Sequence, residues 1–210
     1  CAVSDYWTGM VTKWFPKHEI RQMAMMFGSQ ETIHAVAYSY LNETLGLEDF
    51  AAFLHEPSMA DKFDFLMSTN ADYTDKDLLA NVGDSRKEVA RSLAIFSAFA
   101  EGVSLYSSFA VLYSFQMRNL LKGIGQQMKW SVRDESLHSK MGCRLFNHMC
   151  EEDKELRNEV KDSIYEAAKL IVDMEHNYID KIFEMGDIEN LKAYDLKNFI
   201  YRRTNEKLEE

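Results

Sequence analysis

Apolar residues run through this chain in long stretches that glycine and proline rarely interrupt, a pattern that favours long helices. Polar residues break the pattern at only a few places, and these set the expected ends of the helices. The expected helical stretches are 2–14, 17–45, 48–69, 84–121, 126–150, 153–185 and 188–206. The last two are polar enough to be outer helices. The pattern therefore predicts an all-α protein.

Four signals mark the ends of the earlier helices. The first helix should stop near Pro16, because proline cannot continue a helix from within. Gly46 is a natural cap for the C-terminus of the second helix. Pro57 is acceptable near the start of a helix. The polar stretch 68–75 is expected to be a loop.

The start of the central helix shows a capping pattern. Asp84 or Ser85 can cap its N-terminus, and Glu88 is placed to complete a capping box. Gly123 and Gly125 are expected to separate this helix from the next.

The segment 92–116 is long and poor in charge. Between Arg91 and Arg118 the only charged residue is Glu101, and about 20 apolar residues suffice to span a bilayer. Six serines interrupt the segment, however, and the chain has no second stretch of this kind. We therefore expect the buried central helix of a bundle and no membrane span.

Length and charge narrow the class of protein. A chain of 210 residues fits a single domain, 1–210. Its net charge of −10 argues against nucleic-acid binding and is compatible with a cytoplasmic protein. Cys143 and Cys150 are interpreted as reduced core residues, since three cysteines in all are too few for a disulfide framework. Because the chain begins at Cys1 and not at methionine, we expect a piece of a longer protein, incomplete at both ends.

Glu101 lies in the least charged part of the chain. Burying an ionised carboxylate costs several kcal/mol unless cations or hydrogen bonds compensate. Glu101 is therefore either a protonated or ion-paired core residue or a metal ligand, and its position alone does not decide between them.

Two other helices each carry a Glu-x-x-His motif, Glu31 with His34 and Glu135 with His138. Residues at i and i+3 share a helix face, so each pair can direct a carboxylate and an imidazole at one point. With 6 histidines and 19 glutamates in 210 residues, about 0.5 Glu-x-x-His motifs are expected by chance. The bare motif is thus a weak signal.

The order of these residues is more specific. Ferritin-like di-metal carboxylate proteins take single carboxylates from two helices and Glu-x-x-His from two others. Here one buried Glu101 stands between two such motifs, which predicts a ferritin-like di-metal bundle with additional helices. Oxygen and imidazole ligands suit iron or manganese.

Tyr38 follows His34 by four residues and Glu31 by seven, on the same helix face. It is interpreted either as a core tyrosine with a bonded hydroxyl or, beside metals that activate dioxygen, as a redox-active tyrosine.

Several stretches resemble the class I ribonucleotide reductase small subunit. They are Gln30–Tyr38, Phe99–Gly102 and Arg133–His138, with Asn42–Leu47 and Met59–Lys62 in support. The similarity is good over about residues 5–150 and looser beyond, and the motifs in this order are highly specific to that family.

The resemblance implies a metal-ligand role for Glu31, His34, Glu101, Glu135 and His138. It also implies that Tyr38 becomes a radical when the reduced metals react with dioxygen. Asp134 would bond a ligand histidine, most simply His34, and help to relay the radical. Leu105 and Phe109 would line an apolar pocket around the radical.

The family implies further partners. The radical drives ribonucleotide reduction in a separate large (alpha) subunit, and the small subunit is a homodimer. An Fe/Fe centre is expected, although Mn/Fe and Mn/Mn pairs use the same ligand types.

The chain departs from the family in three respects. The first metal ligand, an aspartate, would fall just before Cys1, and the register disfavours Asp5 as a substitute. The tryptophan of the transfer path and the tail that docks on the large subunit would also lie outside the chain.

Two alternatives remain at this point. The ligands also fit another di-metal oxidase or monooxygenase component. The chain alone also fits a non-enzymatic helical protein, either an iron-storage-like bundle or a metal-free helical fragment. Tyr38, Asp134 and the flanking motifs favour the reductase.

Overall fold

The computed structural model describes residues 2–47, 56–70, 74–80 and 83–210. In these ranges the regular elements are helices, and Ile188 and Leu191 form an isolated bridge. The helices are α1 (Ala2–Asp5), η1 (Tyr6–Val11), α2 (Thr12–Trp14), α3 (His18–Leu45), α5 (Pro57–Ser68), α6 (Asp75–Ala80), α7 (Asp84–Ile95), η2 (Phe96–Ala100), α8 (Tyr106–Met117), α9 (Lys122–Glu152), α10 (Leu156–Glu184) and α11 (Ala193–Glu209). The prediction of an all-α protein is confirmed for this part of the chain.

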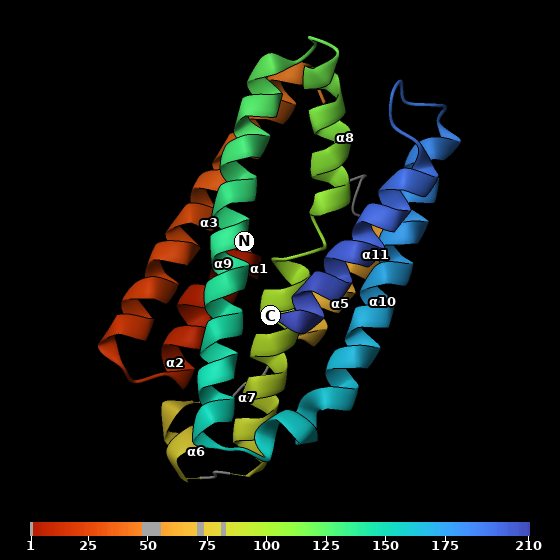
Figure 1. Ribbon diagram of the computed structural model, residues 1–210. Coiled ribbons are helices and arrows are strands. Elements are labelled where there is room, and N and C mark those ends of the chain that lie inside the picture. Colours follow the sequence, from red (N-terminus) through yellow and green to blue (C-terminus); the bar gives the residue numbers. More distant parts are fainter. Residues whose placement is uncertain (1, 48–55, 71–73, 81–82) are drawn as a thin grey trace.

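The long helices pack as a bundle. Figure 1 shows α3 beside α9 on one side of the molecule and α10 with α11 on the other, with α7 and α8 between them. The chain from α1 to α2 is one short helical segment with a wider π-helical middle, η1, and it packs on α3. Helix α5 packs on α10.

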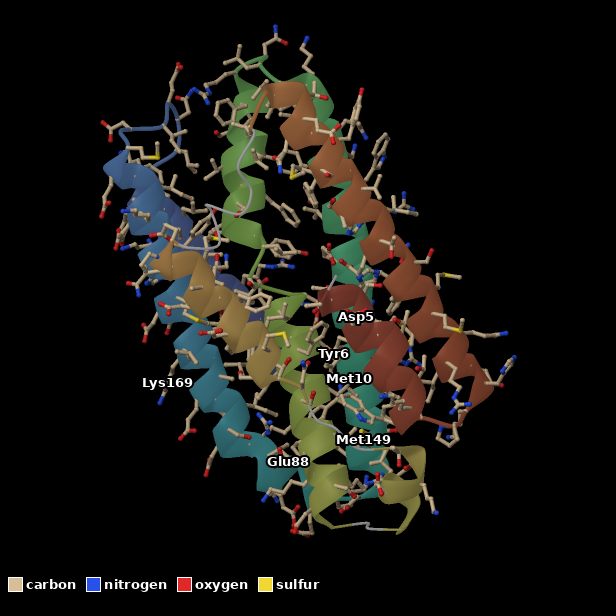
Figure 2. The ribbon with its side chains drawn as sticks, turned by 180° about the vertical axis from the view of Figure 1, so that it is seen from behind. Asp5, Tyr6, Met10, Glu88, Met149 and Lys169 are labelled. Carbon is tan, nitrogen blue, oxygen red and sulfur yellow. The ribbon has the colours of Figure 1, made fainter. Side chains whose placement is uncertain are left out.

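Two groups of buried apolar side chains form the core. The first joins the initial helical segment to α3, α7 and α9; in it the rings of Tyr6 and Phe96 stack with centroids 3.5 Å apart. Figure 2 shows Tyr6 and Met10 of this segment in the same region as Met149 of α9. The second group joins α8, α9, α10 and α11. Burial of this apolar surface is the main force that holds the helices together.

Most predicted helix ends are confirmed. Helix α2 ends at Trp14, two residues before Pro16. Gly46 caps α3 with φ 69°, a left-handed conformation that glycine adopts without strain. Pro57 is the first residue of α5, and Glu56 before it accepts a hydrogen bond from the Ser58 amide. The part of the predicted helix 48–69 before residue 56 lies outside the described residues, as do residues 71–73 of the predicted loop.

The predicted capping box is wrong. The residue before α7 is Gly83, and no side chain caps the helix there. Glu88 instead pairs with Arg91 one turn later, at 2.8 Å, and the Ser85 hydroxyl donates to the Asp77 carbonyl. Asp77 belongs to α6, which begins at the last residue of the stretch predicted as loop.

The single helix predicted over 84–121 is also wrong. It is divided into α7, the π-helical turn η2, a non-helical connection and α8. The amide of Glu101 donates to the Phe96 carbonyl five residues back, at 3.0 Å, in place of the usual four. Gly102, directly after Glu101, disfavours a helix but does not forbid one, so the local sequence did not predict this break.

The turn between α8 and α9 falls before the glycines expected to form it. Gly123 and Gly125 lie inside α9, whereas Asn119 and Leu121 adopt positive φ values of 65° and 45°. The side chain of Gln116 packs where a Cβ of Gly125 would stand, so this glycine serves packing and not a turn.

None of the helices in the described ranges has the length and apolar character needed to cross a bilayer. Cys143 and Cys150 are buried free thiols, which confirms their interpretation as core residues. Burial raises the pKa of the Cys143 thiol to about 11, so it stays protonated and unreactive.

Candidate metal centre

Three elements bring the candidate ligands to one buried place. Helix α3 carries Glu31 and His34, Glu101 directly follows η2, and α9 carries Glu135 and His138. All five side chains are buried, Glu101 with 1% and His138 with 0% of its surface exposed. Each Glu-x-x-His pair shares a helix face, so both members point away from solvent into the interior between the helices.

The ligand atoms lie within contact distance of one another. His138 Nδ1 is 3.0 Å from Glu31 Oε1, 3.3 Å from Glu135 Oε2 and 3.6 Å from Glu101 Oε2. His34 Nδ1 is 3.0 Å from Glu135 Oε1 and 3.7 Å from Glu31 Oε2. Glu31, Glu101, Glu135 and His138 each offer one ligand atom within 4.8 Å of the others. The structure thus brings together the five residues that the sequence singled out.

Several of these atoms have no hydrogen-bond partner. Glu31 Oε1, His34 Nδ1, Glu135 Oε2 and His138 Nδ1 are buried without one. Buried polar atoms are almost always paired, so a converging group of unpaired oxygens and nitrogens requires an explanation. Carboxylate oxygens and imidazole nitrogens are the donors that iron and manganese accept, and the set fits such metals.

Charge repulsion and burial perturb the titration of the carboxyls. Burial, reinforced by the nearby carboxylates of Glu135 and Glu31, raises the pKa of Glu101 well above its usual value. Burial also acts to raise the pKa of Glu135, but the imidazoles of His138 and His34 close to it outweigh burial and lower that pKa to about 2.

The pKa values of the two histidines are raised, although burial alone would lower them. Burial alone disfavours the imidazolium, but Glu135 and Glu31 raise the pKa of His34 to about 10. In the same way Glu101, Glu135 and Glu31 outweigh burial and raise the pKa of His138 to about 11. In the metal-free protein, protons on the two imidazoles therefore offset part of the carboxylate charge.

The outer nitrogen of each histidine is held by a residue from the opposite helix. His34 Nε2 lies 3.0 Å from Asp134 Oδ2, and His138 Nε2 lies 2.9 Å from Gln30 Oε1. Such partners orient the imidazole so that Nδ1 faces the centre. Asp134 was singled out from the sequence, whereas Gln30 was missed.

A sequence signal for Gln30 did exist. Asp134 directly precedes the glutamate of one Glu-x-x-His motif and Gln30 directly precedes the glutamate of the other. Each therefore occupies the same place in its motif and bonds the histidine of the other motif. The correspondence between the two motifs would have identified Gln30 once Asp134 was considered.

Trp7 is a second residue that sequence reasoning missed. Its indole Nε1 donates to Glu101 Oε1 at 2.6 Å, and its side chain is fully buried. It comes from η1, far from Glu101 along the chain, so no local pattern pointed to it. Asp5, on the adjacent α1, is exposed and does not belong to the group of candidate ligands.

Tyr38 lies on α3 beyond His34, half-buried against the second core group. Its hydroxyl donates to Ser131 Oγ of α9 at 3.0 Å. Burial raises the pKa of Tyr38 to about 12, so the phenol is protonated at neutral pH.

The two residues expected around Tyr38 behave differently. Phe109 is buried in the same core group as Tyr38. Leu105 is 37% exposed, so its expected place in an apolar pocket is wrong. The break after Glu101 removes the i+4 relation on which that expectation depended.

The helical bundle and its buried carboxylate and imidazole groups define the ferritin-like class of helical protein. The comparisons narrow this class. The model of the family "Ribonucleotide reductase, small chain" matches residues 1–210, and the chain belongs to this family.

Individual relatives agree with this result. The chain is 35% identical over 204 residues to a probable ribonucleoside-diphosphate reductase small subunit of Invertebrate iridescent virus 3, covering 93% of this chain and 54% of the relative. It is 28% identical over 172 residues to the beta subunit of the Chlamydia pneumoniae reductase, covering 80% and 50%. It is 25% identical over 171 residues to the human subunit M2, covering 77% and 40%. The chain thus spans about half the length of these relatives.

Proposed function

We propose that this chain is the central part of the radical-generating small subunit of a class I ribonucleoside-diphosphate reductase. Residues 1–210 would form one ferritin-like domain. Glu31, His34, Glu101, Glu135 and His138 would hold two metal ions, with an aspartate upstream of Cys1 completing the set. The observation that carries the proposal is their convergence from three elements onto one buried place, where Glu31, His34, Glu135 and His138 each present an atom without a hydrogen-bond partner.

The metal pair that we propose is Fe/Fe, and Mn/Fe and Mn/Mn remain alternatives to be tested. When bound, such a pair supplies a one-electron oxidant formed with dioxygen. The protein excludes water from it, since the ligands are buried. Gln30 and Asp134 hold the two imidazoles in orientation from outside.

Tyr38 is the residue that we propose is oxidised, losing one electron and its phenol proton. At neutral pH that proton is present, and it lies in the hydrogen bond to Ser131 Oγ. Phe109 shares the apolar core group of Tyr38 and would help to keep water from the radical.

The partners that we propose are the large (alpha) subunit, where the radical would drive reduction of ribonucleotides to deoxyribonucleotides, and a second copy of this chain. One face of α3 supports the homodimer, because it exposes large apolar side chains. This apolar face of α3 consists of Met25, Met26, Ile33, Val36 and Tyr40, each more than 60% exposed. The proposed location is the cytoplasm, where buried thiols such as Cys143 stay reduced.

Electron paramagnetic resonance tests the proposed function. Full-length protein loaded with Fe(II) and exposed to dioxygen should show a tyrosyl radical signal, and Tyr38→Phe should abolish it. Tyr201→Phe is the matched control, since Tyr201 lies on α11, away from the candidate ligands, and is 56% exposed. A signal that survives Tyr38→Phe would reject the assignment of Tyr38. Oxidation of a small substrate without a large subunit would favour the monooxygenase alternative. A stability that does not change when Fe(II) or Mn(II) is added would favour the metal-free alternative, because a metal that binds only the folded protein must stabilise it.

A further inference from the structure

The chain directly after Glu101 leaves two backbone carbonyls outside the helical bonding pattern. We call residues 102–105, between η2 and α8, the connecting turn. The amide of Ser104 donates to the Phe99 carbonyl at 2.9 Å, and the amide of Tyr106 donates to the Val103 carbonyl at 3.0 Å. In this pattern no backbone amide donates to the carbonyls of Gly102 and Ser104. Gly102 is buried and Ser104 is half-buried, so both carbonyls need other donors.

Two cationic side chains from distant helices supply those donors. Lys62 of α5 donates from Nζ to the Ser104 carbonyl at 2.7 Å. Arg203 of α11 donates from Nε to the Gly102 carbonyl, and its guanidinium lies 3.3 Å from the centre of the Tyr106 ring. Hydrogen bonds from charged donors are about twice as strong as neutral ones, so the turn is held firmly at both carbonyls.

Lys62 is itself fixed by a buried carboxylate. Its Nζ lies 2.6 Å from Oε1 of Glu175 on α10, and Glu175 is 0% exposed. The other oxygen of Glu175 accepts a hydrogen bond from Ser107, at the start of α8. The ammonium also lies 4.3 Å from the centre of the Tyr178 ring. Removal of one partner of a buried ion pair is strongly destabilising, because it leaves the other charge buried and unpaired. Here both partners also bond to the segment that follows Glu101, Lys62 at the Ser104 carbonyl and Glu175 at the Ser107 hydroxyl.

We propose that Lys62 and Arg203 are positioning residues that hold the connecting turn open and thereby set the carboxylate of Glu101 at the metal centre. The inference rests on the proposed function. Without these two donors the turn would be free to regain ordinary helical bonding, which would satisfy its carbonyls from within the chain. A one-residue change of bonding register turns a side chain by about 100° around the helix axis. Glu101 would then lose its alignment with Glu135 and His138.

Two measurements on the full-length protein test this role. Amide hydrogen exchange of residues 101–106, without metal, reports whether the turn is held. Titration with Co(II), followed by visible absorption, reports the ligand geometry and the affinity. Lys62→Met should speed exchange in the turn, alter the Co(II) absorption and weaken Co(II) binding about 10-fold. Lys62→Arg should restore much of each, since it keeps a cationic donor.

Arg86→Met is the matched control. Arg86 also joins two helices by an ion pair, 2.9 Å from Glu152, but at the far end of α9 from Glu101. It should leave both readouts unchanged. If Lys62→Met fails to fold, the double variant Lys62→Met/Glu175→Leu replaces it. The double variant has no unpaired buried carboxylate and still lacks the donor to the Ser104 carbonyl. Arg203→Met gives an independent variant.

Native exchange and native Co(II) spectra in Lys62→Met and Arg203→Met would overturn the inference. Failure of the unmodified protein to bind Co(II) would instead reject the proposed metal centre, and the exchange data would then still decide whether the two cations hold the turn.

Discussion

At the residue scale, the two histidines of the candidate centre are held by different chemistry. Asp134 is a carboxylate and Gln30 a neutral amide, although they stand at the same place in their motifs. A carboxylate partner raises the basicity of an imidazole more than an amide does. The two metal positions are therefore expected to differ in donor strength.

Gln30→Leu should weaken metal binding. It removes the acceptor that fixes the His138 ring, and loss of such a partner typically costs 10–100-fold in metal affinity. Gln22→Leu is the control, because Gln22 lies on the same helix, is exposed, and contacts only His18 among the hydrogen bonds described for its side chain. Titration with Fe(II) or Co(II) measures the effect. Equal affinities for the two variants would show that Gln30 does not orient His138.

Metal binding should release protons and strengthen as the pH rises. In the metal-free protein the pKa of His34 is raised to about 10 and that of His138 to about 11, so both imidazoles are protonated at neutral pH. A metal binds only the neutral ring, so each histidine must lose its proton, and a higher pH lowers that cost. Calorimetry in buffers of different ionisation enthalpy counts the protons. An affinity independent of pH over the neutral range would contradict the pKa shifts.

At the scale of elements, the close approach of α9 to η2 places Glu101. Gly142 of α9 makes this approach feasible, since a Cβ there would stand 1.9 Å from Ser97 Oγ, 2.6 Å from Ser97 Cβ and 3.3 Å from the Trp7 ring. Ser97 and Trp7 are both fully buried, so neither can move aside freely.

Gly142→Ala should destabilise the protein by about 1–3 kcal/mol, the usual cost of overpacking a core. Gly9→Ala provides the contrast, because no atom lies within 4 Å of a Cβ at that position. Alanine there should stabilise the helical segment by about 0.5–1 kcal/mol, since it lowers the entropy of the unfolded chain. Urea unfolding measures both. Equal effects would mean that helix propensity, and not packing against η2, decides the outcome at Gly142.

At the scale of the whole molecule, apolar surface is distributed unevenly. Helix α3 lies at an edge of the bundle (Figure 1). The exposed residues Ile33, Val36 and Tyr40 follow one another along it at intervals of three and four residues. Exposed apolar patches of this kind mark interaction surfaces. Because the buried side of α3 carries Glu31 and His34, this helix would separate a partner bound there from the candidate metal centre.

Val36→Glu should therefore convert the proposed homodimer into a monomer, since it places a charge inside the interface. Leu170→Glu is the control, because Leu170 on α10 is similarly apolar and 50% exposed but lies away from α3. Light scattering on the full-length protein measures the mass. A monomeric unmodified protein, or a Val36→Glu variant that stays dimeric, would contradict this assignment of the interface.

The sequence alone determined the helical class, most helix ends and the five candidate ligands. These depend on local information: proline and glycine end helices, and a Glu-x-x-His motif shares one face wherever a helix forms. The tertiary structure decided what depends on distant residues. In the break after Glu101, two backbone carbonyls accept hydrogen bonds from Lys62 and Arg203. These residues stand 39 positions before and 102 positions after Glu101 in the chain. The exposure of Leu105 and the contact of Trp7 with Glu101 likewise arise only when separate helices pack, because packing forces side chains into positions that no local pattern encodes.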